Sequence, residues 1–262
     1  MSSPKSRRTD LGIASRWGRR VFDFVLPTAC AGCAGYLPSS GPPGRAPRIC
    51  WECRSRLRPA PHPRCPRCHA PRGTGLAQDR PCAECREWPD ALVGARSAFL
   101  MRSPADALVH ALKYGGWPEL AGELAAWMIR LVEEEPELLG GRTIVPVPTT
   151  RKRLRARGYN QARMLADAVC RGLGETLVDA LQRREGGGSQ VVLHPGERRA
   201  NVVGAFSVSY RRDVSKAIRD RDLLLVDDVL TTGATAGSAA EALRDGGARS
   251  VVVLTFARAL PT

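Results

Sequence analysis

Two adjacent aspartates near the end of the chain carry the clearest chemistry. Asp227 and Asp228 follow four apolar residues at 223–226, which predict a buried strand. A turn of small residues comes next, made of Thr231, Thr232, Gly233, Ala234 and Thr235. Backbone N–H groups of such a turn, at the start of a helix, point at an anion. Carboxylates beside it can accept hydrogen bonds from ribose hydroxyls and help to hold Mg²⁺, so the pattern predicts a site for a sugar phosphate.

Other nucleotide sites fit the sequence less well. No GxxxxGK(S/T) motif is present, which argues against a P-loop ATPase, and no GxGxxG motif follows a strand, which argues against a dinucleotide-binding Rossmann unit. A response regulator carries its acid pair near its first strand, whereas this pair comes late in the chain. An ordinary strand-turn-helix with surface acids remains the plain alternative.

The acid pair and the turn together resemble the motif of type I phosphoribosyltransferases that binds 5-phosphoribosyl 1-pyrophosphate (PRPP). The resemblance implies that Asp227 and Asp228 are the catalytic pair and hold the ribose 2- and 3-hydroxyls. It implies that the turn at 231–235 cradles the 5-phosphate. Mg²⁺ is expected to accompany PRPP.

Eight of the nine cysteines form four CxxC pairs in the first third of the chain. The pairs are Cys30/Cys33, Cys50/Cys53, Cys65/Cys68 and Cys82/Cys85. Two-residue spacing lets both sulfurs of a tight turn face one tetrahedral ion, which favours structural Zn²⁺ over disulfides or redox motifs. Grouping by chain order gives two zinc ribbons, and an interleaved cross-brace is the alternative. Four-thiolate sites leave no open coordination position, so these ions are expected to hold structure and perform no chemistry.

Three further residues are candidates for metal binding or thiol chemistry. His62 and His69 lie close enough to the cysteine pairs to act as ligands, but eight thiolates make them bystanders in our interpretation. Cys170 stands apart in a helical pattern and is expected to be a small core residue.

With the four CxxC pairs in front, the chain resembles the ComF family over nearly its whole length. The matching blocks, in order, are Lys113-Tyr114-x-Gly116, Val145-Pro146-Val147-Pro148, Arg157-Gly158-Tyr159-Asn160, Ser189-Gln190, and Arg198-Arg199-x-Asn201. The resemblance implies PRPP binding and a link to incoming single-stranded DNA in natural transformation, together with other competence proteins. It also implies a flexible loop that contains Ser189, Gln190 and Arg198.

Four alternating arginines follow the apolar run at 143–147, namely Arg151, Arg153, Arg155 and Arg157. They come where a strand ends in the same crevice as Asp227, so their guanidinium groups could clamp the pyrophosphate of PRPP. Lys113 could approach the same anion from a helix-ending turn. A solvated basic loop or a nucleic-acid patch fits the arginine run as well.

The element pattern predicts an α/β fold, a mainly parallel sheet flanked by helices as in type I phosphoribosyltransferases. The expected strands are 95–100, 143–147, 205–210, 223–226 and 250–256. One helix is expected to begin after an N-cap at Ser103, and three more are expected at 119–134, 160–173 and 237–243. A mobile loop is expected at 186–189. We divide the chain into a basic leader (1–25), a double zinc ribbon (26–90) and a phosphoribosyltransferase-type domain (91–262).

Charge and composition narrow the class of protein. The net charge of +14 over 262 residues predicts a polyanionic partner, a nucleic acid or a phosphorylated small molecule, although a genome bias toward arginine explains single surface arginines equally well. No apolar stretch is long enough to span a membrane, and no secretion signal is recognised, so a cytoplasmic protein is expected.

Three functions remain open. The first is a PRPP-binding protein that also binds single-stranded DNA, with Trp51 and Trp88 stacking on bases. The second is a glycosyltransferase-class enzyme, a Mg²⁺-dependent phosphoribosyltransferase that acts on a base or an amine. Glutamine-dependent activity is disfavoured because the chain has no N-terminal nucleophilic cysteine. The third is a PRPP-sensing regulator without catalysis.

Overall fold

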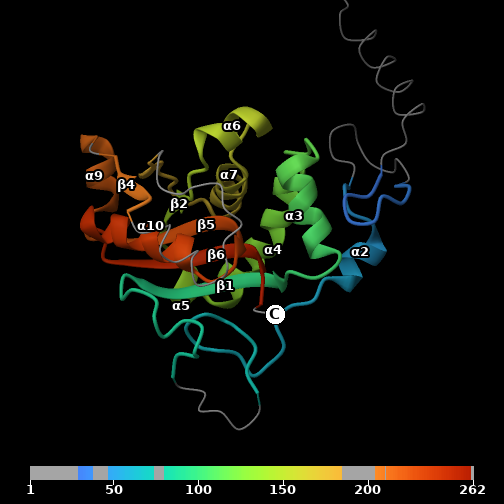
Figure 1. Ribbon diagram of the computed structural model, residues 1–262, viewed down its shortest axis with the longest axis horizontal. Coiled ribbons are helices and arrows are strands. Elements are labelled where there is room, and N and C mark those ends of the chain that lie inside the picture. The colour runs from blue at the N-terminus through green and yellow to red at the C-terminus, as the bar shows by residue number, and fades with distance from the viewer. Residues whose placement is uncertain (1–28, 38–46, 74–79, 185–203, 210, 261–262) are drawn as a thin grey trace, which may run out of the picture.

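The computed structural model describes residues 29–37, 47–73, 80–184, 204–209 and 211–260. Its centre is a four-stranded parallel sheet in the order β1-β6-β5-β2 (Figure 1). The strands are β1 (Leu92–Leu100), β2 (Thr143–Pro146), β5 (Asp222–Leu230) and β6 (Ser250–Arg258). The two middle strands are almost continuously apolar, as expected for parallel strands that are covered on both faces.

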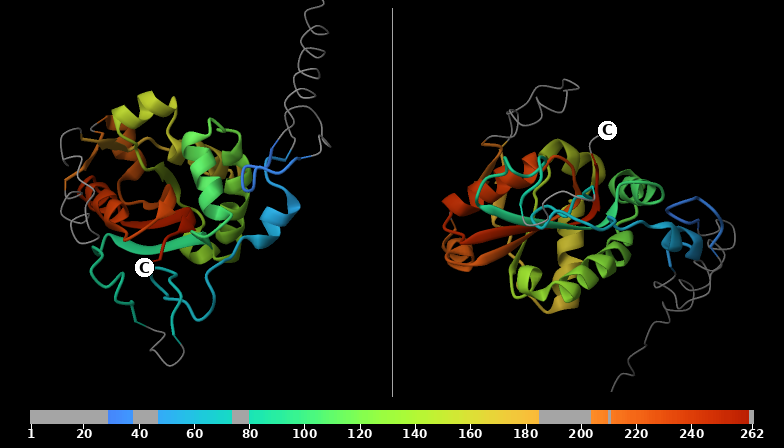
Figure 2. Two further views of the ribbon diagram at one scale, coloured as in Figure 1. Left: turned by 45° about the vertical axis from the view of Figure 1, so that its right-hand side comes forward. Right: turned by 90° about the horizontal axis from the view of Figure 1, so that it is seen from below.

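One face of the sheet is covered by α3 (Ala105–Tyr114), α4 (Leu120–Glu134), α5 (Pro136–Leu139) and α7 (Gln161–Leu173). Alternate residues of the middle strands, such as Leu224, Val226 and Phe256, point into this core. The apolar residues of α4 recur at helical spacing, so one stripe of the helix packs inward. The two turned views show α4 and α7 on one side of the sheet and α10 on the other (Figure 2).

The opposite face carries a second core beneath α10 (Ala234–Asp245) and α9 (Arg212–Ile218). Leu223, Leu225 and Val253 point into it. A small antiparallel sheet of β3 (Leu181–Arg183) and β4 (Phe206–Val208) lies against α10 on this side. The remaining helices are α2 (Trp51–Arg56) in the cysteine-rich part and α6 (Arg151–Arg157) after β2.

The fold class predicted from the sequence is confirmed, with several boundaries corrected. β5 does not end at residue 226 but runs on to Leu230, because Asp227 and Val229 still pair with β6. α10 begins at Ala234 and is longer than the predicted 237–243. Ser103 is not the N-cap of α3; Pro104 takes that position without a side-chain hydrogen bond. Strand β4 is shorter than the predicted 205–210, whose last residue lies outside the described part of the chain.

The predicted division into leader, zinc ribbons and catalytic-type domain stays a prediction. The leader at 1–25 and the predicted mobile loop at 186–189 lie outside the described residues. Buried cysteines of both CxxC sets belong to the same two cores as the sheet residues. Among the described helices, none is long and apolar enough to cross a membrane.

Candidate functional site

The two aspartates leave β5 toward opposite faces of the sheet, as successive strand residues do. Asp228 is 4% exposed, and the ammonium nitrogen of Lys113, from the last turn of α3, lies 2.6 Å from its Oδ2. Tyr159 steadies that turn, because its hydroxyl donates to the carbonyl oxygen of Leu112 at 2.6 Å. The structure therefore brings Lys113 to the acid pair, and the cation balances the buried carboxylate.

Asp227 points the other way, into a cavity of about 20 Å³ that Gly233, Thr235 and Thr255 also line. This volume has room for about one water molecule and not for a phosphate. Burial raises the pKa of Asp227 well above the ordinary value for aspartate, and the charge of Asp228 raises it further. The backbone N–H of Asp228, which donates to Asp227 Oδ1 at 2.8 Å, and Lys113 act in the opposite direction. Asp227 thus holds its proton more tightly than an ordinary aspartate.

The predicted phosphate turn lies between β5 and α10. Gly233 caps the helix with φ at +83°, a left-handed conformation that glycine adopts without strain. Ala234 and Thr235, predicted as turn residues, are instead the first residues of α10. The N-terminus of a twelve-residue helix therefore opens beside Asp227, and its first N–H groups and its dipole favour an anion there.

The four predicted arginines lie on the helix α6, which excludes the alternative of a solvated basic loop. Thr150 caps α6 by accepting a hydrogen bond from the backbone N–H of Arg153. Arg157 donates to Gln161 Oε1 at 2.9 Å and lies 4.6 Å over the ring of Tyr114, next to Lys113. Arg151, Arg153 and Arg155 are exposed. Because residues four apart share a helix face, Arg153 and Arg157 form one pair and Arg151 and Arg155 another.

One arginine near the site was missed by the sequence analysis. Arg183 lies on β3 with its guanidinium 5.2 Å over the ring of Phe206. Burial lowers its pKa; Arg153 lowers it further, and Asp227 raises it, so the side chain is within electrostatic range of both. No motif marks Arg183, because only the fold brings β3 toward Asp227. The predicted loop residues Ser189, Gln190 and Arg198 lie outside the described residues.

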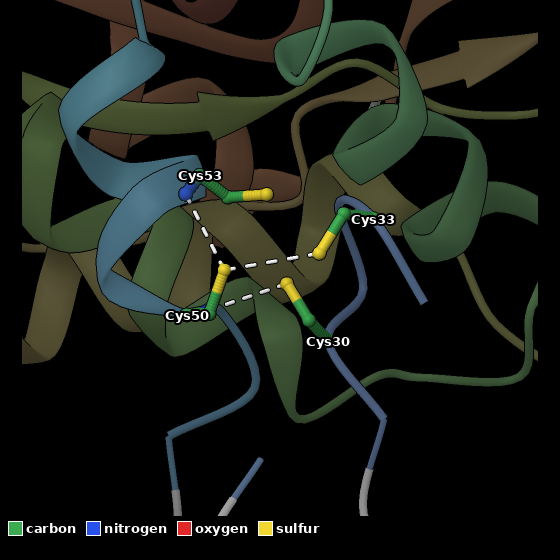
Figure 3. A group of neighbouring side chains, drawn as sticks. All are labelled: Cys30, Cys33, Cys50 and Cys53. Carbon is green, nitrogen blue, oxygen red and sulfur yellow. Dashed lines mark hydrogen bonds between the residues drawn. The ribbon is translucent and has the colours of Figure 1, made fainter. Parts of the chain in front are cut away.

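The cysteines form two groups of four in chain order, as the ribbon grouping predicts, so the interleaved cross-brace is excluded. Within each group all four sulfurs lie within 4.8 Å of one another. Figure 3 shows Cys30, Cys33, Cys50 and Cys53 of the first group directed toward a common centre. The sulfurs of Cys33 and Cys50 are 3.8 Å apart, and those of Cys65 and Cys85 in the second group 3.6 Å. Four thiolates about 2.3 Å from one tetrahedral ion would be about 3.8 Å apart, so both groups fit Zn²⁺.

The surroundings of the thiols also suit metal binding. Burial raises the pKa of Cys30, but backbone N–H groups that donate to its sulfur outweigh this and bring the pKa to about 7. The same balance brings the pKa of Cys65 to about 6. Each group therefore contains one sulfur that the backbone prepares to be a thiolate, the form that binds metal.

His69 and Cys170 take the places that the sequence predicts. His69 is buried and bonds to Arg64 at 2.8 Å, and burial lowers its pKa to about 3, so it is neutral and outside both cysteine groups. His62 likewise belongs to neither group. Cys170 packs at the edge of the α4–α7 core and donates to the carbonyl oxygen of Glu175.

The two tryptophans predicted to stack on bases differ. Trp51, the first residue of α2, is 79% exposed, which leaves its ring free for such a contact. Trp88 is 7% exposed, and its indole N–H donates to the carbonyl oxygen of Thr232 at 3.0 Å. The stacking role predicted for Trp88 is therefore wrong, because the ring is buried under the phosphate turn.

Known proteins are similar in sequence to the part of the chain that contains the acid pair and the turn, and to much of the rest of the chain. The family model "Phosphoribosyl transferase domain" matches residues 160–260, which include β5, the turn and α10. "DNA utilization protein YhgH" of Escherichia coli (strain K12) is 27% identical over 232 residues, which cover 82% of this chain and 98% of that protein. "Competence protein F" of Haemophilus influenzae is 35% identical over 117 residues, covering 44% of this chain and 50% of that protein. These matches support the resemblance of the chain to the ComF family.

A further relative, "Competence protein ComFC" of Bacillus subtilis, is 22% identical over 222 residues, covering 80% of this chain and 84% of that protein. Among solved structures, the "allosteric regulatory enzyme of purine biosynthesis" shares 17% identity over 52% of this chain and 26% of that chain, with a TM-score of 0.34. The family resemblance that the sequence motifs indicate is confirmed by the named relatives.

Proposed function

We propose that this protein binds PRPP together with Mg²⁺ at the carboxyl ends of β2 and β5. The observation that carries the proposal is the meeting of three features at one place: the Lys113–Asp228 ion pair, Asp227 with its raised pKa, and the N-terminus of α10 behind Gly233. In open α/β sheets, ligands bind in the crevice at the carboxyl ends of the strands. A molecule with a phosphate, vicinal hydroxyls and a pyrophosphate matches these groups in order.

Each group has a distinct role in the proposal. The turn at 231–233 and the first N–H groups of α10 bind the 5-phosphate. Asp227 and Asp228 accept hydrogen bonds from the ribose hydroxyls. Mg²⁺, where it accompanies PRPP, neutralises pyrophosphate and makes it a better leaving group.

The cations around the acid pair are placed to hold the pyrophosphate. Lys113 is in the last turn of α3, and Arg157 at the end of α6 lies over the ring of the adjacent Tyr114. In the proposal Arg153 of α6 and Arg183 of β3 reach the pyrophosphate as well. Guanidinium groups bind phosphate oxygens in pairs, so two arginines can orient the leaving group while Lys113 contributes a point charge. Arg155, on the other face of α6, is exposed and can contact nucleic acid.

The raised pKa of Asp227 predicts how PRPP binding depends on pH. A raised carboxyl pKa means that the folded protein keeps a proton at pH values where an ordinary aspartate has lost it. Binding beside Mg²⁺ requires the ionised form, so PRPP affinity should rise with pH through the raised pKa and level off above it. Calorimetry in buffers of different ionisation enthalpy measures the protons released. Asp228→Asn removes the like charge and should move the rise to lower pH; a flat profile for both proteins would contradict the assignment.

We further propose that the protein acts on single-stranded DNA. The names of its relatives refer to DNA utilization and competence, its net charge is +14, and Trp51 and Tyr36 near the first cysteine group are 79% and 67% exposed. Exposed aromatic rings with surrounding cations are typical of sites that bind single strands without sequence preference.

Salt dependence tests the DNA proposal. Each phosphate contact that is lost should reduce the slope of log affinity against log salt by about 0.7. Arg155→Gln should lower this slope in fluorescence anisotropy with an oligonucleotide, whereas Arg130→Gln, exposed on α4, should leave it unchanged. Equal slopes for both variants would show that α6 does not contact the DNA.

A phosphoribosyltransferase reaction is the second candidate, and the acid pair beside the turn favours it over a sensor without catalysis. Pyrophosphate release from PRPP, followed with a panel of bases and amines, separates the two. Release that depends on one acceptor and is lost in Asp227→Asn supports the enzyme. PRPP binding without release under any acceptor supports the sensor.

A further inference from the structure

Trp88 forms the floor of the phosphate turn. A Cβ atom added at Gly233 would lie 2.5 Å from the indole ring, so the backbone of the turn rests directly on it. The indole N–H donates to the carbonyl oxygen of Thr232 at 3.0 Å. The next residue, Pro89, supports the first turns of α10, because a Cβ atom at Gly237 would lie 3.1 Å from its ring. The turn and the start of α10 thus pack on residues far earlier in the chain; Trp88 and Thr232 are 144 positions apart.

Trp88 is in turn held by the second cysteine group. Arg67 lies between Cys65 and Cys68, and its guanidinium group donates to four backbone carbonyl oxygens. These belong to Cys85, Trp88, Pro89 and Leu92, at distances of 2.9 to 3.2 Å. The same guanidinium lies 5.9 Å over the Trp88 ring. One side chain therefore fixes the metal-binding turn and the tryptophan together.

A second arginine joins this cysteine group to the strand from which the turn starts. Arg258, the last residue of β6, is 1% exposed and donates to the carbonyl oxygen of Cys68 at 2.8 Å and to Glu84 at 2.5 Å. In the sheet Arg258 pairs with Leu230, the last residue of β5. Both ends of the phosphate turn are therefore connected to residues around Cys68 and Cys85.

We propose that Trp88 is a positioning residue for phosphate binding, and that through it the second cysteine group sets the affinity for the 5-phosphate. The inference rests on the proposed function. A turn that must point its N–H groups at one anion loses conformational freedom on binding, and a preformed turn avoids that cost. Trp88 supplies the preformed surface, and Arg67 and Arg258 hold Trp88 in place.

Trp88→Phe tests the hydrogen bond while it keeps an aromatic floor. Ribose 5-phosphate probes the turn, and inorganic pyrophosphate with Mg²⁺ probes the other end of the site. In calorimetry the variant should bind ribose 5-phosphate about fivefold more weakly and pyrophosphate as the wild type does. Trp127→Phe is the matched control: Trp127 packs against Phe99 and Phe256 and supports the first cysteine group, so this variant should leave both affinities unchanged.

The outcomes distinguish a failure of the proposed PRPP binding from a failure of the role of Trp88. If the wild type binds neither PRPP nor ribose 5-phosphate, the proposed function fails. If the wild type binds both but Trp88→Phe binds ribose 5-phosphate equally well, only the role of Trp88 is overturned. Equal weakening of ribose 5-phosphate and pyrophosphate would indicate a general structural effect and would also overturn it.

A second experiment does not depend on the hydrogen bond. Gly233→Ala adds a methyl group against the Trp88 ring and should weaken ribose 5-phosphate binding at least about tenfold. In a Trp88→Ala background this contact is absent, so Gly233→Ala should weaken ribose 5-phosphate binding clearly less. Gly174→Ala, at φ +70° with no atom within 4 Å of the added carbon, reports the backbone cost alone in thermal unfolding. An equal effect of Gly233→Ala in both backgrounds would show that Trp88 is not the floor of the turn.

Discussion

The two cysteine groups have the same four ligands and different neighbours. The first packs beside α3 and α4: the backbone N–H of Arg48 donates to Glu123 at 2.5 Å, and Arg54 pairs with the same carboxylate and lies 5.5 Å over Trp127. The second lies under the carboxyl ends of β5 and β6 and supports the phosphate turn through Trp88. The first group presents an exposed tryptophan, whereas the second buries its own.

The comparison shows how one type of metal module can serve two purposes in one chain. A four-thiolate site fixes a short segment that has almost no apolar core of its own. What the segment does then depends on the side chains that it projects. Trp51 of the first group is exposed and can contact a partner such as single-stranded DNA. Trp88, next to the second group, is buried and supports the phosphate turn.

The largest effect on stability is expected at Lys113, which joins α3, a neighbour of the first cysteine group, to the acid pair. Lys113→Met leaves the buried Asp228 without its cation and should lower the free energy of unfolding by about 3 kcal/mol at neutral pH. The Lys113→Met/Asp228→Asn double variant removes both charges and should recover most of that loss. Chemical denaturation measures both. An unchanged stability of the single variant would mean that the ion pair does not hold α3 against β5.

The next effect distinguishes the two cysteine groups directly. Cys82→Ser removes one ligand of the second group and should weaken PRPP binding by about tenfold, because the support of Trp88 is loosened. Cys33→Ser removes one ligand of the first group and should change PRPP affinity at least about threefold less. Zinc content, thermal stability and calorimetry are measured on each. Equal losses of PRPP affinity would remove the distinction between the groups.

The smallest effect concerns the outward face of the first group. Trp51→Ala should weaken binding of an oligonucleotide by about 1 kcal/mol, roughly fivefold, since one stacking contact is lost. The PRPP affinity of this variant should match the wild type. Fluorescence anisotropy and calorimetry on the same preparation give both values. Unchanged DNA binding would leave Trp51 without a role in the account.

The sequence predicted what local patterns encode. The spacing of the four CxxC pairs indicates metal binding, but only the structure decides which pairs share a group. An apolar run followed by two acids and a threonine-glycine turn marks the end of β5. The sequence analysis predicted no helix for the arginine run, although Thr150 can cap one and arginine and lysine have good helix propensity. Trp88 was assigned a wrong role and Arg183 none, because the contacts of both depend on partners that are far away in the chain.

Calorimetric titration of the zinc-loaded protein with PRPP and Mg²⁺, repeated on Asp227→Ala/Asp228→Ala, shows whether the acid pair is needed for PRPP binding. The account predicts saturable binding by the wild type and none detectable by the variant, with zinc content the same in both. Absence of binding by the wild type, or equal binding by the variant, would contradict the claim that the acid pair and the phosphate turn form a PRPP site.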